Sequence, residues 1–255
     1  MIGFKFASSS SSQQRCHIEI IMSLNAADLY NVKGLVALVT GGGSGLGLTM
    51  TQALIANGAA KVYIASRRID SLKAAAASIG PNVIPIQCDA TNKEDLERAA
   101  QKVKDDAGFL NLVVCNSGAT GPGGNMFGSK DQTAEEFAEG EMCVEYDDYL
   151  KTFSINTTSV WFTAMAFLPL LNAGNKKGNV SQTSQVIIIS STSGLMKLGG
   201  AGWAYGQSKA ASIHLTKQLS TLLPKWKMRA NCITPGCKSA AEMLRKREKY
   251  LEIFS

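Results

Sequence analysis

The chain has 255 residues, of which 45% are hydrophobic and 18% are charged, and its formal net charge at pH 7 is +6. These values are ordinary for one globular α/β domain. The positive charge is dispersed apart from a basic run at 245–249, and the sequence has no basic-aromatic stripe and no nucleic-acid-binding module. We therefore expect no nucleic-acid partner.

The cysteine pattern and the N-terminal segment bear on where the protein works. None of the six cysteines forms a C-x-x-C pair or a zinc-ligand spacing, which predicts no metal site and favours a reducing compartment. Residues 1–32 contain the serine run 8–12 with Lys5 and Arg15, and no acid precedes Glu19. This composition has some likeness to a mitochondrial transit peptide. Since Met22 is an alternative start, we expect a disordered or partly ordered extension and a cytoplasmic protein.

Strand and helix signals alternate from residue 35 onward, which predicts βαβ units and a parallel sheet. Pro85 favours an edge position for its strand, and Thr91–Glu94 has the pattern of a helix capping box. The segment 120–147 predicts a long loop with a short helical piece. In chain order, we expect strand 35–39, helix 48–56, strand 61–66, a helix from a cap at Asp70 to Gly80, strand 83–88, helix 91–106, strand 112–115, helix 149–171, strand 186–189, helix 204–223, strand 228–233 and a basic helix over 239–254.

The fold class that follows is α/β: a single Rossmann-type, doubly wound domain over residues 33–255. Its parallel sheet would have six strands, or seven, flanked by helices. The uncharged run 152–175 is long enough to raise the question of a membrane span, but seven polar or proline residues interrupt it. We expect instead a helix buried between the sheet and a partner subunit, and no membrane association.

The turn Thr40–Gly47, with the sequence Thr-Gly-Gly-Gly-Ser-Gly-Leu-Gly, is the most informative stretch of the chain. It follows an apolar strand and opens a helix. Glycines there permit positive φ and let a phosphate approach the backbone, while the first amides of the helix face that phosphate. The pattern predicts a nucleotide-binding turn, although plain strand–helix connections also contain glycine.

Two further patterns could carry chemistry. Tyr205 and Lys209 stand four residues apart on a predicted helix and so share one face. A free tyrosine has a pKa of about 10 and is a poor base near neutral pH, but a neighbouring ammonium favours the phenolate. The hydroxyl cluster Ser190–Ser193 follows a predicted strand, where ligands of α/β sheets bind, although such clusters also serve as turn caps.

Together these motifs resemble the short-chain dehydrogenase/reductase family over roughly residues 33–236. The resemblance rests on the Thr40–Gly47 turn, Asp89, Cys115–Gly118, Asn156, Ser191, Tyr205 with Lys209, and Pro235–Gly236. The family usually has Asn-Asn-Ala-Gly where this chain has Cys-Asn-Ser-Gly, so only Asn116 is carried over there. The spacing from Ser191 to Tyr205 is one residue longer than the commoner family spacing, which leaves Ser190 or Thr192 as substitutes for Ser191.

The resemblance implies a role for each matched residue. Tyr205 would pass a proton to or from the substrate oxygen, and Ser191 would bind and orient the substrate carbonyl. Lys209 would lower the pKa of Tyr205 and hold the nicotinamide ribose. Asn156 would anchor a water that links Lys209 to solvent. The expected cofactor-binding residues are Gly41, Ser44, Gly45, Leu46, Gly47, Ser66, Arg67, Arg68, Asp89, Asn116, Tyr205, Lys209, Pro235 and Gly236.

The residues after the second strand bear on the choice of cofactor. An acid there would accept from the ribose 2′-hydroxyl of NAD and repel a 2′-phosphate. This chain has Ser66, Arg67 and Arg68 instead, and a guanidinium offers a two-pronged donor to phosphate. The sequence therefore predicts NADP(H), unless both arginines are merely solvated residues at the start of a helix.

Two functional hypotheses follow. The first is an NADP(H)-dependent oxidoreductase that interconverts a small-molecule carbonyl and an alcohol. The second is a catalytically impaired NADP(H)-binding protein, because relatives usually continue with a substrate-covering loop, a helix and a further strand after the Pro-Gly pair. The resemblance also implies a homo-oligomer, either a dimer or a tetramer.

Overall fold

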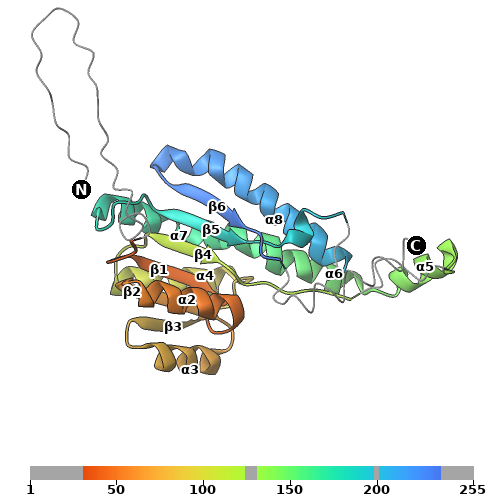
Figure 1. Cartoon of the computed structure of the whole chain (residues 1–255), viewed down its shortest axis with the longest axis horizontal. Helices are drawn as coiled ribbons and strands as arrows, with labels where there is room; N and C mark the ends of the chain where they lie inside the picture. Colours follow the sequence, from red (N-terminus) through yellow and green to blue (C-terminus); the bar gives the residue numbers. More distant parts are fainter. Residues whose placement is uncertain (1–30, 124–130, 198–200, 237–255) are drawn as a thin grey trace, which may run out of the picture.

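The computed structural model describes residues 31–123, 131–197 and 201–236. This part contains one six-stranded sheet, in which every pair of neighbouring strands is parallel and the order is β3-β2-β1-β4-β5-β6 (Figure 1). The order reverses between β1 and β4, as in a doubly wound Rossmann fold, which confirms the expected class. The strands are β1 (Val36–Thr40), β2 (Lys61–Ser66), β3 (Val83–Gln87), β4 (Leu112–Cys115), β5 (Gln185–Ile189) and β6 (Arg229–Ile233).

Helices cover both faces of this sheet and create two apolar cores. One core packs α2 and α3 against β1 and β2, and the other packs α4, α7 and α8 against the opposite face. The helices are α2 (Gly45–Ala56), α3 (Ile69–Ile79), α4 (Lys93–Asp106), α5 (Ala134–Met142), α6 (Tyr146–Phe153), α7 (Ser159–Lys177) and α8 (Trp203–Leu222), with short turns η1 (Ser154–Thr158), η2 (Thr192–Gly194) and η3 (Leu223–Trp226).

The central strands are buried on both faces, as their continuous apolar runs predict, because helices flank a parallel sheet on each side. The two edges differ from this pattern. Pro85 lies in β3 at one edge, as expected for a residue without an N–H donor, and the Lys102 ammonium donates to its carbonyl at 3.2 Å. At the other edge, β6 alternates between exposed and half-buried residues.

Two predicted helix caps are wrong. Asp70 does not cap α3, because Arg68 holds the extended N-cap position and Asp70 falls within the first turn. Thr91–Glu94 is not a capping box, because the cap lies one residue later: the side chain of Asn92 accepts from the Asp95 amide at 2.8 Å. Asp70 still lies in the first turn of α3, and Glu94 lies in the first turn of α4. A carboxylate in this position interacts favourably with the helix dipole.

The helix predicted over 149–171 has different bounds in the structure, and it contains a turn that is not α-helical. The helical run extends from α6 through η1 to α7, and η1 is a single π turn. Thr157 within it donates to the carbonyl of Ser208 in α8 at 2.9 Å, so contacts with a neighbouring helix hold the wider turn. The short helical piece expected within 120–147 is α5, and it has a complete capping box formed by Thr133 and Glu136.

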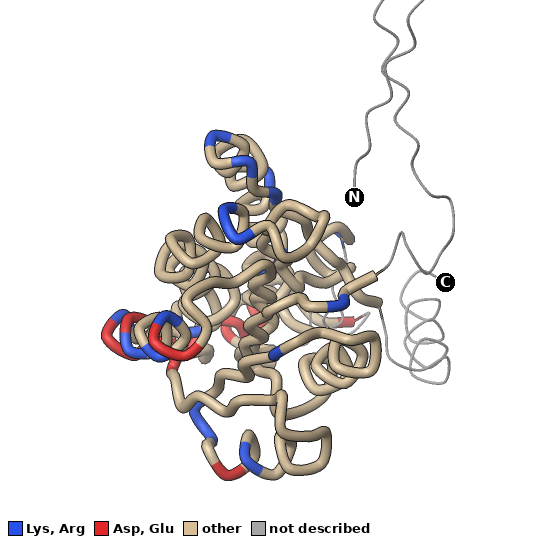
Figure 2. The backbone as a smooth tube through the Cα atoms, turned by 90° about the vertical axis from the view of Figure 1, so that its left-hand side faces the viewer, with Lys and Arg blue, Asp and Glu red and all other residues tan. Residues whose placement is uncertain are grey.

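Further sequence predictions concern the two ends of the chain, membrane association, metal binding and the distribution of basic residues. The predicted helix 239–254 and almost all of the N-terminal extension lie outside the described residues. Within the described part, no helix is long and apolar enough to cross a membrane, and no cluster of His, Cys, Asp or Glu could hold a metal ion. Among the described residues, Lys and Arg are spread over several elements in the view of Figure 2.

Candidate active site

A cleft of about 430 Å³ opens at the carboxyl ends of β1, β2, β3 and β4. One of its walls is a face of the helical run from α6 to α7, which contributes Lys151, Ser154, Ile155 and Ser159. Because ligands of doubly wound sheets bind where the strand order reverses, this cleft lies at the expected place. The sequence-predicted residues that line it are Gly41, Ser44, Ser66, Arg67, Arg68, Asp89 and Asn116.

The glycine turn is held tightly against the end of β4. Gly41 has a φ of +67°, and the side-chain amide of Asn116 donates to the carbonyl of Thr40 at 2.9 Å. A Cβ on Gly47 would lie 2.6 Å from that amide nitrogen and closer still to the Gly41 carbonyl oxygen. Gly47 therefore serves the close approach of helix to turn and does not itself line the cleft.

Thr40 is a site residue that sequence reasoning treated only as the start of the turn. Its hydroxyl is buried and accepts from the backbone amides of Asn116 at 3.0 Å and Ser117 at 3.1 Å. These bonds join β1 to β4 where the sheet opens into the cleft. A lone hydroxyl at the end of an otherwise apolar strand was the signal that could have identified it.

The first turn of α2 presents donors with no internal partner. Ser44 occupies the N-cap without capping the helix through its side chain, and the first turn contains no acid. The amides of Gly45, Leu46 and Gly47 have no acceptor among the described residues. An uncapped helix start of this kind suits an anion such as a phosphate.

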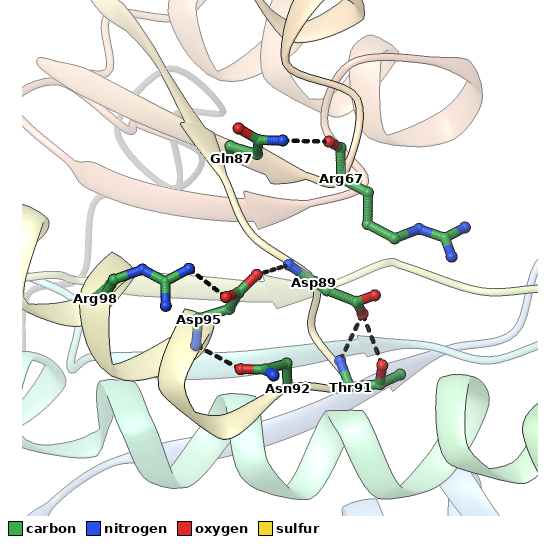
Figure 3. Close-up of polar contacts among 7 residues, drawn as sticks. All are labelled: Arg67, Gln87, Asp89, Thr91, Asn92, Asp95 and Arg98. Carbon is green, nitrogen blue, oxygen red and sulfur yellow. Dashed lines mark hydrogen bonds and ion pairs between the residues drawn. The ribbon is translucent and has the colours of Figure 1, made fainter.

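The residues after β2 and β3 supply three charged side chains to the cleft, those of Arg67, Arg68 and Asp89. Figure 3 shows Arg67 and Asp89. Arg67 and Arg68 are exposed, and neither guanidinium has a hydrogen bond or ion pair with any residue that the structure describes. The Arg67 side chain extends away from Gln87, which contacts only the Arg67 carbonyl. One oxygen of Asp89 accepts from both the amide and the hydroxyl of Thr91, so the carboxylate is held in place.

Lys209 is the buried cation of the site. It is 4% exposed, and its ammonium donates to the carbonyl of Ile189 at the end of β5, at 2.8 Å. Burial lowers the pKa of Lys209 to about 8, and the charge of nearby Cys232 opposes this decrease. The side chain is therefore still mostly charged at pH 7, although desolvation makes that charge costly.

Tyr205 and Asn156 lie around this ammonium. The Lys209 nitrogen is 5.8 Å from the centre of the Tyr205 ring, which is half-buried one helical turn earlier. The Asn156 side-chain amide makes three hydrogen bonds: it accepts from the Ala119 amide at 2.9 Å and donates to the Ala119 carbonyl and the Ser208 hydroxyl. The structure thus brings Tyr205, Lys209 and Asn156 close together.

Gly118 connects this group with the cleft. It lines the cleft, and a Cβ built on it would lie 3.4 Å from the Lys209 nitrogen and 3.2 Å from Asn156 Oδ1. Tyr205, Lys209 and Asn156 do not themselves line the cleft. Because Gly118 lines the cleft and adjoins Lys209 and Asn156, this group of three residues lies at one end of it.

The hydroxyl groups of Ser190 and Ser191, which follow β5, have different hydrogen-bond partners. Ser190 is buried and donates to the Lys209 carbonyl at 2.8 Å, which occupies its hydroxyl inside the protein. Ser191 is 8% exposed, and its oxygen accepts from the Ser193 amide at 3.1 Å, which leaves its proton for another partner. This favours Ser191 or Thr192 over Ser190 as a substrate contact. Pro235 and Gly236 adjoin Thr192, whose amide donates to the Pro235 carbonyl at 3.0 Å, and do not line the cleft.

Comparison with known proteins agrees with this geometry. The family model described as short chain dehydrogenase matches residues 35–251. The chain is 44% identical over 220 residues to the short-chain dehydrogenase/reductase PhomF of Diaporthe leptostromiformis, covering 85% of this chain and 74% of that protein. It is 31% identical over 205 residues to the secoisolariciresinol dehydrogenase of Forsythia intermedia, covering 80% and 66%. Among solved structures, the NADP active-site complex of RhlG from Pseudomonas aeruginosa superposes with a TM-score of 0.67 at 26% identity, covering 87% of this chain and 79% of that one.

The chain therefore belongs to the short-chain dehydrogenase/reductase family, a class of oxidoreductases that use a nicotinamide cofactor.

Proposed function

We propose that this protein is an NADP(H)-dependent oxidoreductase that interconverts a carbonyl and a secondary alcohol, with Tyr205 as the general acid/base. The observation that carries the proposal is the position of Tyr205 beside the buried Lys209 ammonium, next to a cleft that is also lined by Arg67 and Arg68. This arrangement supports a role for Tyr205 in proton transfer and for the two arginines in binding an anionic part of the cofactor.

The donors around the cleft fit a phosphorylated dinucleotide. The uncapped start of α2 suits the pyrophosphate, with Gly41, Ser44, Gly45, Leu46 and Gly47 around it. Asp89 and Asn116 would flank the adenosine, and Ser66, Arg67 and Arg68 would bind the 2′-phosphate. The similar RhlG structure is described as an NADP complex, which supports the same choice. When bound, the nicotinamide supplies or accepts the hydride.

In the proposed mechanism, each residue at the end of the cleft acts on one atom. The Tyr205 hydroxyl gives its proton to the substrate oxygen during reduction and takes it back during oxidation. The Lys209 ammonium, 5.8 Å from the centre of the Tyr205 ring, favours the phenolate form that follows proton transfer, and it would hold the nicotinamide ribose of a bound cofactor. The Ser191 hydroxyl donates to the substrate oxygen, and Asn156 holds the water that connects Lys209 with solvent.

The test of the reaction is Tyr205→Phe. Removing a positioned general acid costs on the order of 10²- to 10⁴-fold in turnover, so we expect that loss of NADPH oxidation with a panel of ketones, quinones and β-ketoacyl thioesters. Cofactor binding, followed by NADPH fluorescence, should persist in the variant. Unchanged turnover would remove Tyr205 from the mechanism. Cofactor binding without turnover of any substrate by the native chain would favour the catalytically impaired alternative.

The test of the cofactor choice is Arg67→Ala. Because Arg67 is exposed and its charge is screened, we expect a loss of NADPH affinity of about tenfold and little change for NADH. Arg229→Ala is the matched control, because Arg229 contacts Thr183 at the opposite end of the sheet. Tighter binding of NADH than NADPH by the native protein would contradict the assignment.

We also propose that the protein works as a dimer or tetramer. Helix α7 supports this, because it carries no charge from Ser159 to Asn175 and leaves Trp161 at the surface with 37% of its area exposed. Light scattering coupled to size-exclusion chromatography measures the mass directly, and a monomer at micromolar concentration would contradict the proposal.

A further inference from the structure

A second cavity of about 280 Å³ adjoins the cofactor cleft, and the proposed reaction assigns no role to it. It lies between the segment after β4 and helix α6. Three residues, Ala119, Lys151 and Ile155, line both this side cavity and the cleft, so the two spaces meet there. The junction is next to Gly118, which adjoins the Lys209 ammonium.

The wall of the side cavity is fixed at three points. Asn156 holds both the amide and the carbonyl of Ala119. Gly121, with a φ of +75°, packs on Thr152 so closely that a built Cβ would lie 2.9 Å from the Thr152 methyl carbon and closer still to its hydroxyl. A Cβ on Gly202, at the start of α8, would lie 2.8 Å from the Pro122 carbonyl. The cavity therefore belongs to a preorganised part of the fold.

Among the described residues that line the side cavity, Lys151 is the only cation. It shares one helix face with Ser154 and Ile155, at spacings of three and four residues, which directs it to the junction. Its ammonium has no hydrogen bond or ion pair with any described residue, although Asp148 lies three residues earlier on the same helix. Asp148 lines the side cavity but not the cleft. An anion would thus find favourable charge at the junction and unfavourable charge where Asp148 lines the side cavity.

We propose that Lys151 binds an anionic oxygen group, a carboxylate or a phosphate, carried by the substrate of this enzyme. The inference rests on the proposed function and narrows it to carbonyl compounds that also bear an acid. Ala119 lines both spaces and directly follows Gly118, so one small molecule could place its carbonyl near Tyr205 and its acid at Lys151. The ammonium acts as a binding contact that selects among substrates and takes no part in proton transfer.

The test uses a pair of probes that differ in one charge, 4-acetylbenzoate and its methyl ester. Calorimetric titration into the NADP⁺-saturated protein measures both affinities without turnover, because the oxidised cofactor has no hydride to give to the ketone. We expect the acid to bind about 3- to 10-fold more tightly than the ester, a modest factor because Lys151 is exposed and its charge is screened. Lys151→Met should abolish the preference, Lys151→Arg should retain it, and added salt should weaken it.

The control is Lys176→Met, which removes an exposed lysine near the end of α7 and changes the net charge equally. Retention of the preference in this variant supports the proposal. Equal affinities for acid and ester in the native protein, or failure of the acid to bind, would overturn it. The same holds if Lys151→Met weakens NADPH binding and leaves the acid-to-ester ratio unchanged, because the ammonium would then serve the cofactor's phosphates. None of these outcomes depends on the activity of the Tyr205→Phe variant. The proposed reaction and the proposed binding of an anion by Lys151 can therefore be refuted independently.

Discussion

Gly47→Ala tests whether the close contact between the glycine turn and β4 shapes the cofactor site. The added methyl would meet the Gly41 carbonyl and the Asn116 amide, 2.6 Å away, and both belong to well-packed backbone or a bonded side chain. Overpacking of this kind costs about 1–3 kcal/mol, whereas replacing glycine in a helix interior gains at most about 1 kcal/mol. Because Gly47 lies in the first turn of α2, we expect the clash to win by about 1–2 kcal/mol.

Gly140→Ala is the matched control, since this glycine is also helical and an added Cβ would have nothing within 4 Å. We expect Gly140→Ala to be neutral or stabilising by about 0.5–1 kcal/mol. For a chain of this size, each kcal/mol moves the unfolding midpoint by about 2–4 °C, so Gly47→Ala should melt about 2–8 °C lower than the native protein. Its NADPH affinity should also decrease, because Gly41 and Asn116 must shift. The reasoning is refuted if Gly47→Ala melts no lower than Gly140→Ala and binds NADPH as the native protein does.

Two further predictions concern pH. Because burial lowers the pKa of Lys209 from 10.5 to about 8, the unfolded chain binds more protons than the folded one between these values, and native stability should rise as pH increases from 8 to 10.5. Urea unfolding of Lys209→Met should lack this rise and should show higher stability at pH 7, by about 1–3 kcal/mol; a parallel pH profile would contradict the buried charge. At acid pH, hydrogen bonds from Tyr63 and then Lys61 lower the pKa of Asp106, so this carboxylate contributes stability above its unfolded pKa of about 3.9 that is lost as pH falls through the lower folded value. Tyr63→Phe should flatten that acid limb in unfolding experiments between pH 5 and 2, and an unchanged slope would show that the bond is not important.

The strands of this fold could be predicted because each is a short apolar run that a turn-forming residue follows in the sequence. The expected strands 61–66 and 112–115 match β2 and β4, since both are short, buried runs bounded by turn residues. Helix starts were less predictable. Asn92 and Thr91 are both good caps, and the choice between them depended on Asp89, whose carboxylate engages Thr91.

The site could be predicted as a set of residues but not as an arrangement. The π turn at Asn156 depends on Ala119 and Ser208, which are 37 and 52 positions away, so no local pattern predicts it. Burial of Lys209 against the Ile189 carbonyl likewise requires the packing of α8 on β5. The side cavity follows from the packing of Gly121 on Thr152, which joins two segments that the sequence presents as a loop and a helix.

The two borders of the sheet differ in their capacity to recruit another strand. At β3, Pro85 offers no amide hydrogen, and the ammonium of Lys102 already engages its carbonyl. At β6, the outermost described strand on the other side, Ile233 leaves 47% of its area uncovered. Within the part of the chain that the structure describes, extension of the sheet by a strand from elsewhere is therefore directional: it is disfavoured beside β3 and open beside β6.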